Sequence, residues 1–285
     1  MGRKARTFSL LLDNRAGKAG VAVLAFFILV AIFAPLISPF DPYERVGAPF
    51  ESPSRRHLLG TNDIGHDILS ELIYGSRISM LIGVLSAAVS LSIGTTVGMT
   101  AGYLGGRTDS ILMRIVDLIL VIPMLPLMIL LAAFIGPSFW NIILVIGLLS
   151  WAGPARVIRS QVLTVKNKGY VESVRVLGAK PAYTIFRHIL PPTMSIVISE
   201  LILMSSRAIL MEASLSFLGL GDPTRKSWGI ILYYAQARSA FLTDAWLWWI
   251  LPPGILITVL VISFSYIGNA LEEIVNPRLR RRVGP

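Results

Sequence analysis

The chain has 285 residues, of which 54% are hydrophobic and only 15% are charged. Soluble domains carry about 25% charged residues, so this composition disfavours a soluble globular class and indicates a membrane protein. The chain has no cysteine, which excludes disulfides and thiol chemistry. Its net charge of +10 is also typical of nucleic-acid-binding proteins, but the positions of the charges favour a different explanation.

The N-terminal region combines basic residues with an apolar run, as a signal peptide does. The run 19–37 is long for the apolar part of a signal peptide, however, and no small-x-small cleavage site follows it. We therefore predict an uncleaved first span over 19–38, preceded by a cytoplasmic segment, 1–18. This span is expected to end at the turn-rich sequence Ser38-Pro39-Phe40-Asp41-Pro42.

Further apolar runs predict five more spans, because a spanning helix needs about 20 mostly apolar residues. The uncharged run 118–155 has 38 residues. As one helix it would be about 57 Å long, too long for a single crossing. Gly136-Pro137-Ser138 interrupts the run and predicts a hairpin of two spans. The spans expected after the first are 79–102, 115–135, 139–158, 194–218 and 246–268.

The distribution of basic residues orients these spans. Six is an even number, so both termini lie on one side of the membrane. If that side is the cytoplasm, the inner segments hold 18 of the 26 Lys and Arg residues and the outer segments hold 7. The positive-inside rule then predicts cytoplasmic termini and explains the basic charge without nucleic acid. The single transmembrane domain 19–285 would have outer loops 39–77 and 219–245, an inner loop 156–193 and a cytoplasmic tail 269–285.

The inner loop carries the most informative pattern. Apolar residues at spacings of three predict a short amphipathic helix through Val171, Val174 and Leu177. Gly178 suits a helix C-terminus and Pro181 the first turn of a second helix. Ile185 and Ile189 fall on one face of that second helix, which is expected to end at Leu190-Pro191-Pro192. From the residues alone, a helix lying on anionic lipid is as good an interpretation as a docking element.

Within this loop, Glu172-Ser-Val, Gly178 and His188-Ile-Leu-Pro191 resemble the EAA loop of ABC-importer permeases. That pattern is Glu-Ala-Ala, three residues, Gly, nine residues and Ile-x-Leu-Pro. The spacing fits without a gap, and the departures are Ser173, Val174 and His188. The resemblance implies that the loop docks in a cleft of an ATP-hydrolysing subunit. When the ATPase dimer closes, the loop would transmit this movement to the spans. The positions carried over are Glu172, Gly178, Leu190 and Pro191.

The resemblance extends along nearly the whole chain. Blocks similar to the dipeptide, oligopeptide and nickel permeases are Asn14-Arg15, Phe33–Pro42, His57–Asp67, Tyr74–Arg77, Glu212–Gly221, Ser227–Gly229 and Asn276–Arg278. They point to the second, C-type, of two permease subunits. This implies an ATP-driven importer of peptides or related small solutes in a prokaryotic inner membrane. The sequence does not decide among peptides, nickel, oligosaccharides and glutathione as the solute.

The resemblance also implies the partners. A second permease of similar fold, two ATP-binding cassette subunits and an extracytoplasmic solute-binding protein are expected. This chain has no Gly-x-x-x-x-Gly-Lys-Ser/Thr phosphate loop. We therefore expect no cofactor in this chain and no enzymatic activity, with ATP and Mg²⁺ bound by the ATPase subunits. Metal binding is also not expected, and we interpret the candidate outer ligands as structural residues: His57, Asp63, His66 and Asp67.

Charged residues inside the fifth span require an explanation, because each costs about 2.5–3.5 kcal/mol on membrane insertion. These residues are Glu200, Arg207 and Glu212. They line a possible solute pathway, or they pair with another permease subunit, and we favour the second interpretation.

Two rival functions remain. An ion-gradient-driven transporter would use intramembrane carboxylates such as Glu200, Glu212 and Asp117. A membrane assembly subunit would transport nothing.

Overall fold

The computed structural model describes residues 14–275 of the chain. Residues 1–13 and 276–285 lie outside the described part, and with them most of the predicted cytoplasmic N-terminal segment and the end of the predicted tail. Within 14–275 the chain is helical, with a single isolated bridge between Thr61 and Asp67 in place of any strand. The expected all-α class is therefore confirmed for the described residues.

The helices follow one another with short connections, apart from the long segment 38–67, which we call the outer cap after the side of the membrane predicted for it from the sequence. The α-helices are α2 (Arg15–Ile37), α3 (Ile68–Leu104), α4 (Gly106–Val121), α5 (Met124–Ile135), α6 (Phe139–Leu149), α7 (Ala152–Lys166), α8 (Gly169–Val176), α9 (Pro181–Thr184), α10 (Leu190–Leu215), α11 (Trp228–Ala237), α12 (Trp246–Trp249) and α13 (Leu251–Val275). Two π-helical turns, η1 (Ile185–Ile189) and η2 (Ser216–Leu220), flank α10, and a 3₁₀ turn, η3 (Ala240–Leu242), follows α11.

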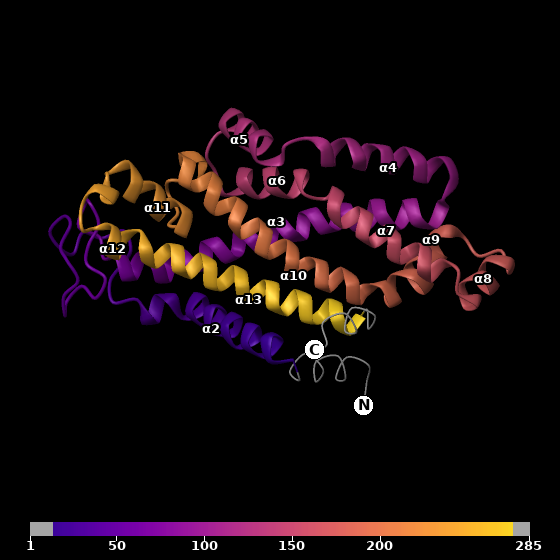
Figure 1. Ribbon diagram of the computed structural model, residues 1–285, viewed down its shortest axis with the longest axis horizontal. Helices are drawn as coiled ribbons and strands as arrows, with labels where there is room; N and C mark the ends of the chain where they lie inside the picture. The colour runs from indigo at the N-terminus through magenta and orange to yellow at the C-terminus, as the bar shows by residue number, and fades with distance from the viewer. Residues whose placement is uncertain (1–13, 276–285) are drawn as a thin grey trace, which may run out of the picture.

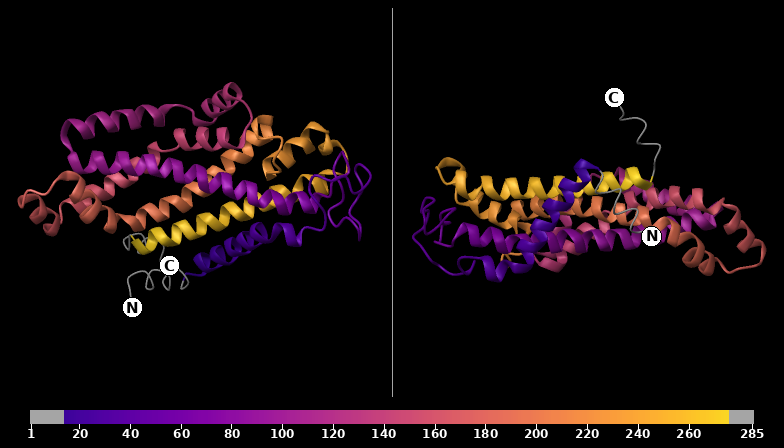
Figure 2. Two further views of the ribbon diagram at one scale, coloured as in Figure 1. Left: turned by 180° about the vertical axis from the view of Figure 1, so that it is seen from behind. Right: turned by 90° about the horizontal axis from the view of Figure 1, so that it is seen from below.

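By length and composition, four helical segments in the described chain can each cross a membrane: Arg15–Ile37, Ile68–Leu104, Pro181–Leu220 and Trp246–Glu273. Two further candidates are bent pairs, α4 with α5 and α6 with α7. The count is six if each bent pair is one span. The long helices run along the long axis of a flat molecule, with the outer cap at one end and α8 at the other (Figures 1 and 2).

The hairpin predicted from 118–155 is present, because α5 ends at Ile135 and α6 begins at Phe139. The helices on each side of this turn are bent. α4 and α5 meet at an angle of 85°, and α6 and α7 at 44°. The first bend falls at Ile122, which precedes Pro123 and has an extended backbone with ψ of 131°. Steric conflict with a following proline ring excludes the helical conformation there.

The second long helix begins earlier than the charge pattern indicated. α3 starts at Ile68, whereas the first uncharged residues predicted a start near 79. Asp67 caps this helix, its side chain accepting a hydrogen bond from the backbone N–H of Ser70 at 2.9 Å. Glu71, in the first turn, is buried because it has a basic partner, described below. The last ten residues of the predicted outer loop 39–77 are thus helical, and the non-helical segment before them is the outer cap, 38–67.

Close packing along α3 organises the bundle. The inner half of α3 presents Gly94, Gly98 and Gly102 to α7. A Cβ atom at Gly98 would lie only 2.6 Å from the carbonyl oxygen of Ala155. Helices in a membrane associate through such close backbone contacts, because lipid supplies little hydrophobic force between them. The absence of side chains on this face therefore sets the distance between α3 and α7.

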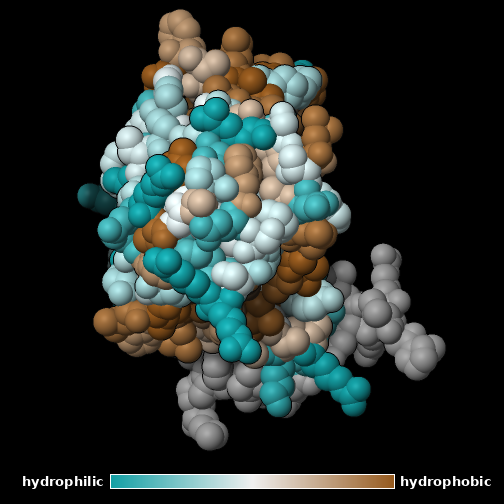
Figure 3. All heavy atoms as spheres, turned by 90° about the vertical axis from the view of Figure 1, so that its left-hand side faces the viewer, coloured by the Kyte–Doolittle hydropathy of each residue, from teal (hydrophilic) through white to brown (hydrophobic). Residues whose placement is uncertain are grey.

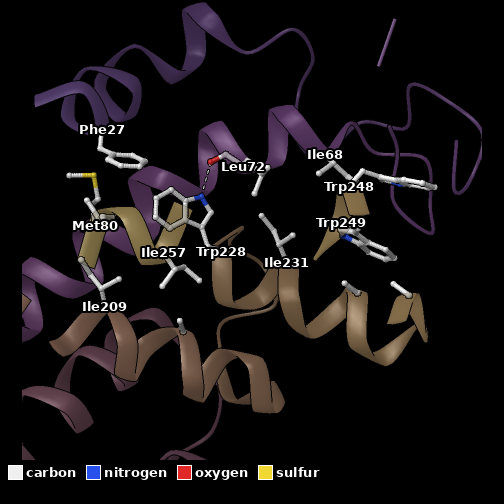
Figure 4. Close-up of a cluster of buried hydrophobic side chains, with 14 of the residues drawn as sticks. Phe27, Ile68, Leu72, Met80, Ile209, Trp228, Ile231, Trp248, Trp249 and Ile257 are labelled. Carbon is white, nitrogen blue, oxygen red and sulfur yellow. Dashed lines mark hydrogen bonds between the residues drawn. The ribbon is translucent and has the colours of Figure 1, made fainter. Parts of the chain in front are cut away.

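A second packed region lies toward the outer end, where Figure 4 shows side chains from several helices meeting. Trp228 of α11 is fully buried, and its indole Nε1–H donates to the carbonyl of Leu72 at 2.9 Å. Phe27 of α2 packs edge-on against Trp228, with the ring centroids 5.6 Å apart. Ile209 of α10 and Ile257 of α13 complete this contact region. It joins the first helix to the rest of the bundle.

The close approach of α3 to α7 predicts a difference between two glycine substitutions. Gly98→Ala should lower the free energy of unfolding by about 1–3 kcal/mol, because the new methyl group meets backbone atoms that cannot rotate away. Gly153→Ala should have no destabilising effect, because no atom lies within 4 Å of its added Cβ. Thermal unfolding of the detergent-solubilised protein measures both. Equal melting temperatures for the two variants would contradict this packing.

Candidate functional site

The inner loop joins α7 to α10 and lies at the end of the molecule opposite the outer cap (Figure 1). α8 and α9 form two short helices, as expected, and Gly178 between them has φ of +78°. Such a left-handed backbone is costly for any residue with a side chain. The predicted role of Gly178 as a helix-ending residue is therefore confirmed by the backbone conformation.

The second helix of the loop does not end at the Leu190-Pro191-Pro192 sequence, so that prediction was wrong. The chain passes from α9 through the π-helical turn η1 directly into α10. Pro191 and Pro192 occupy the first turn of α10, where a missing backbone N–H costs little. A π-helical turn shifts the hydrogen-bond register by one residue, and this shift accommodates the prolines without a break.

The predicted coupling positions lie along this loop. Glu172 is exposed in the first turn of α8, Gly178 is exposed after its end, and Leu190 and Pro191 begin α10. Val171 faces inward and packs with Val165 of α7 and Ile189 of η1. This single buried residue fixes α8 to the bundle, so the exposed positions are held on a supported element.

Exposed apolar side chains at the tip of the loop were not predicted. Leu177, expected on the same apolar face as Val171, is 85% exposed, and Val176 and Phe186 are also exposed. Phe186 lines a shallow groove with Ala182, Tyr183 and Arg187. Contiguous exposed apolar groups with a polar rim are typical of protein interaction sites. Periodicity alone could not identify them, because an apolar residue facing outward has the same spacing as one facing inward.

The three charged residues of α10 have different surroundings. Arg207 is exposed, Glu200 is half-buried, and Glu212 is fully buried. The Oγ–H of Ser216 donates to Oε1 of Glu212 at 2.8 Å. Glu200 and Arg207 are seven residues apart and share a face, whereas the spacing of five puts Glu212 on a different one. The structure therefore does not bring the three residues together into one cluster.

Two ion pairs between α4 and α7 were not anticipated. Nε and Nη2 of Arg159 donate to the two carboxylate oxygens of Asp109, at 2.5 and 2.6 Å. Arg156 forms a second pair with Asp117 nearer the bend. The Asp109–Arg159 pair is half-buried and bidentate, a geometry that is stronger than a single contact. These pairs hold the first half of the bent α4–α5 pair against α7.

At the opposite end of the molecule, the outer cap holds the residues considered as metal ligands. Figure 3 shows this end as hydrophilic over most of its centre, with apolar side chains at its margins. The ring Nδ1 of His57 lies 3.0 Å from Asp67, and both residues are buried. His66 instead lies beside Glu71, and Asp63 pairs with Arg238. Among the described residues, no three His, Cys, Asp or Glu side chains are arranged to hold a metal ion.

Residues 221–229, which we call the outer connector, comprise the segment between η2 and α11 and the first two residues of α11. Asp222 accepts a hydrogen bond from the backbone N–H of Phe139 at 3.1 Å and so fixes the start of α6. Burial by itself raises the pKa of Asp222, but hydrogen bonds from Thr224 and Phe139 and the charge of Arg225 outweigh it and hold the pKa below its usual value. Asp222 therefore remains charged at neutral pH and keeps this contact.

Long apolar helices, a largely hydrophilic outer end (Figure 3) and a supported inner loop define the class of this protein, a helical membrane protein that crosses the bilayer several times. Residues 94–281 match the family described as the binding-protein-dependent transport system inner membrane component. Residues 5–54 match the N-terminal transmembrane domain of oligopeptide transport permease C. The chain belongs to this family of membrane transport components, which confirms the resemblance found in the sequence, and the family members are permeases rather than enzymes.

Individual relatives match over nearly their whole length. The dipeptide transport system permease protein DppC of Bacillus subtilis is 35% identical over 95% of this chain and 84% of its own. The oligopeptide transport system permease protein OppC of the same organism is 35% identical over 94% of this chain and 88% of its own. The dipeptide permease DppC of Haemophilus influenzae is 36% identical over 94% of this chain and 92% of its own.

The conformation of the inner loop predicts a specific sensitivity. Gly178→Ala should destabilise the loop by about 1–2 kcal/mol, because φ of +78° forces the new Cβ against the following carbonyl. Gly169→Ala is the matched control, since its added Cβ meets no atom within 4 Å. Hydrogen exchange of the α8 amides measures the effect, and we expect about 5- to 30-fold faster exchange in Gly178→Ala alone. Equal exchange in the two variants would show that this backbone conformation is not required.

Proposed function

We propose that this chain is one permease subunit of an ATP-driven importer for short peptides, with six spans, both termini in the cytoplasm and the inner loop facing partner ATPase subunits. The observation that carries the proposal is the inner loop itself. Its α8 is fixed to the bundle by Val171, while Val176, Leu177 and Phe186 remain exposed. Peptides are proposed as the solute because the relatives are named as dipeptide and oligopeptide permeases.

The remaining subunits follow from the same proposal. A second permease of similar fold would complete the pathway, two ATP-binding cassette subunits would contact the inner loop, and a solute-binding protein would dock at the outer cap. The family name supports the last of these, since its members depend on binding proteins. ATP and Mg²⁺ would be held by the ATPase subunits. The inner membrane of a prokaryote is the corresponding location.

In this arrangement, ATP binding closes the ATPase subunits and displaces the inner loop as a rigid unit. Glu172 and Gly178 would contact the ATPase cleft, and Leu190 and Pro191 would transmit the displacement to α10. The absence of a break between α9 and α10 supports this role, because a continuous helix transmits movement without an intervening flexible linker. Switching by rigid-body movement of packed helices is a well-established mode of conformational change.

The coupling role of the inner loop is tested in reconstituted complexes. The permease is purified with its co-purifying subunits, placed in proteoliposomes and assayed for ATP-dependent uptake of radiolabelled dialanine and trialanine. We expect Glu172→Lys and Gly178→Pro each to reduce uptake at least tenfold, because both change the surface offered to the ATPase. Arg107→Glu reverses a charge at an exposed position of α4, outside both the inner loop and the outer cap, and should leave uptake unchanged.

Two outcomes would contradict the proposal. Uptake by the permease without any ATPase subunit would favour the ion-gradient-driven alternative. A complex that assembles but transports no solute under any condition would favour an assembly subunit.

A second test concerns the charges of α10. We propose that Arg207 contacts the second permease subunit, because an exposed guanidinium facing lipid would cost several kcal/mol. Glu200 and Glu212 would likewise act in helix contacts rather than on the solute, and Ser216 supports this for Glu212. A solute pathway along Arg207 and Glu200 is the alternative.

The variant Arg207→Gln decides between these roles. We expect at least a threefold loss of the co-purified second permease, with unchanged preference among peptides in the complexes that still form. Arg238→Gln, at an exposed arginine beyond α11, serves as the control and should assemble normally. Normal assembly combined with an altered peptide preference in Arg207→Gln would support the solute pathway instead.

A further inference from the structure

The segment that follows α8 connects the two ends of the molecule. Pro181–Leu220 is a stretch of 40 residues, about 60 Å at 1.5 Å per residue, which is helical up to the kink at Gly219 near its end. The regular helix α10 forms its centre, and the π-helical turns η1 and η2 lie at its two ends. Such turns are rare and concentrate at functional sites. α10 is thus a stiff element with a locally different helix geometry at each end.

The outer end of this stretch leads directly into the outer connector. Gly219, with φ of +83°, ends the helix, and the connector then returns to pack against α3. The backbone N–H of Trp228 donates to Oγ of Ser79 at 3.0 Å, and its indole donates to the carbonyl of Leu72 (Figure 4). The connector is therefore held on α3 by hydrogen bonds, independently of its attachment to α10.

A buried ion pair links the connector to the outer cap. Nζ of Lys226 donates to Oε1 of Glu71 at 2.7 Å, and both side chains are at least nine-tenths buried. The same carboxylate oxygen accepts a hydrogen bond from Nδ2 of Asn62 in the cap at 2.9 Å. His66, also in the cap, lies 3.4 Å from this oxygen. One carboxylate at the start of α3 thus holds the cap and the connector together.

Burial makes this contact sensitive to displacement. Removing Lys226 from Glu71 would leave two charges with little solvent, which is strongly unfavourable. A second contact between the cap and the end of α11 joins Asp63 to Arg238 at 2.8 Å. The Arg238 side chain is 58% exposed, and exposed pairs of this kind contribute little. A displacement of the connector is therefore transmitted to the cap mainly through Glu71.

We infer that Glu71 and Lys226 are positioning residues that transmit a displacement of α10 to the outer cap. In the opposite direction, they transmit the effect of docking at the cap to the inner loop. This inference rests on the proposed function, because it assigns the route between the docking site outside and the ATPase contact inside. The continuous helix carries the movement across the membrane. The Lys226–Glu71–Asn62 contacts carry it from the connector to the cap.

The double variant Glu71→Gln/Lys226→Met tests the route. It removes both charges together, so no buried charge is left unpaired, and the new side chains are similar in size. The introduced glutamine amide oxygen can still accept the hydrogen bond of Asn62, so only the link to the connector is lost. The matched control is Asp63→Asn/Arg238→Gln, which removes the exposed ion pair between the cap and the end of α11. Lys226→Arg retains a cation beside Glu71 and serves as the conservative variant.

The complete complex in proteoliposomes is assayed for ATP hydrolysis with and without trialanine-loaded binding protein. In Glu71→Gln/Lys226→Met we expect stimulation by the binding protein to fall at least fivefold, while basal hydrolysis and the amount of assembled complex stay within twofold of wild type. The matched control should keep its stimulation, and Lys226→Arg should keep most of it. A purely structural role would instead lower assembly and basal hydrolysis together.

The outcomes separate the inference from the proposed function. Undiminished stimulation in the double variant, or a loss of basal and stimulated hydrolysis in equal proportion, would overturn the inference alone. A wild-type complex whose hydrolysis does not respond to loaded binding protein would overturn the proposed function and the inference with it.

Discussion

The close approach of α3 to its neighbours is the constraint on which the remaining structure depends. Gly98 brings the backbone of α3 against that of α7, and Gly83 makes room on α3 for the side chain of Ile209 of α10. In a bilayer, burial of apolar side chains supplies little net force between helices, so association relies on van der Waals contact and interhelical hydrogen bonds. Small residues on α3 allow such contact on two sides. The positions of α7 and α10, and of the inner loop between them, follow from it.

The polar groups are arranged around this packed centre in a way that suits a membrane. The bidentate Asp109–Arg159 pair fastens α4 to α7, and the Glu71–Lys226 pair fastens the outer connector to α3. Between them, serine and threonine hydroxyls of α3 donate to carbonyls one turn earlier, as in Ser92 and Thr96. These two hydroxyls are satisfied within α3 and need no partner from outside the helix. The buried hydroxyls of Ser86, Ser90 and Thr95 on the same helix have no hydrogen-bond partner among the described residues.

Much of the fold could be predicted from the sequence, because uncharged runs and turn residues are local signals. The hairpin at Gly136 and the αL conformation of Gly178 are examples. The start of α3 could not be predicted, because Glu71 depends on Lys226, 155 residues away in the chain. The proline at 123 is a local signal that was overlooked, and it accounts for the 85° bend.

For the candidate site, sequence reasoning located the inner loop but not its surface. The exposure of Val176, Leu177 and Phe186 depends on which side of α8 and η1 faces the bundle, and Val171 alone decides this for α8. The prolines at 191 and 192 misled the prediction for a related reason. Their tolerance within a continuous helix depends on the π-helical turn before them, which has no recognisable sequence pattern.

The continuity of the helix across these prolines has a consequence for how the two ends of the molecule communicate. A helix that ended at Leu190 would connect the inner loop to the bundle through a flexible segment. A displacement of the inner loop would then not be transmitted to α10. The observed path has no such joint at Leu190, and the first non-helical backbone after Pro181 is at Gly219. The departures from regular α-helical geometry lie instead at η1 and η2, next to the inner loop and next to the outer connector. A long regular helix between two distant surfaces suits a protein that must couple them while its packed centre stays intact.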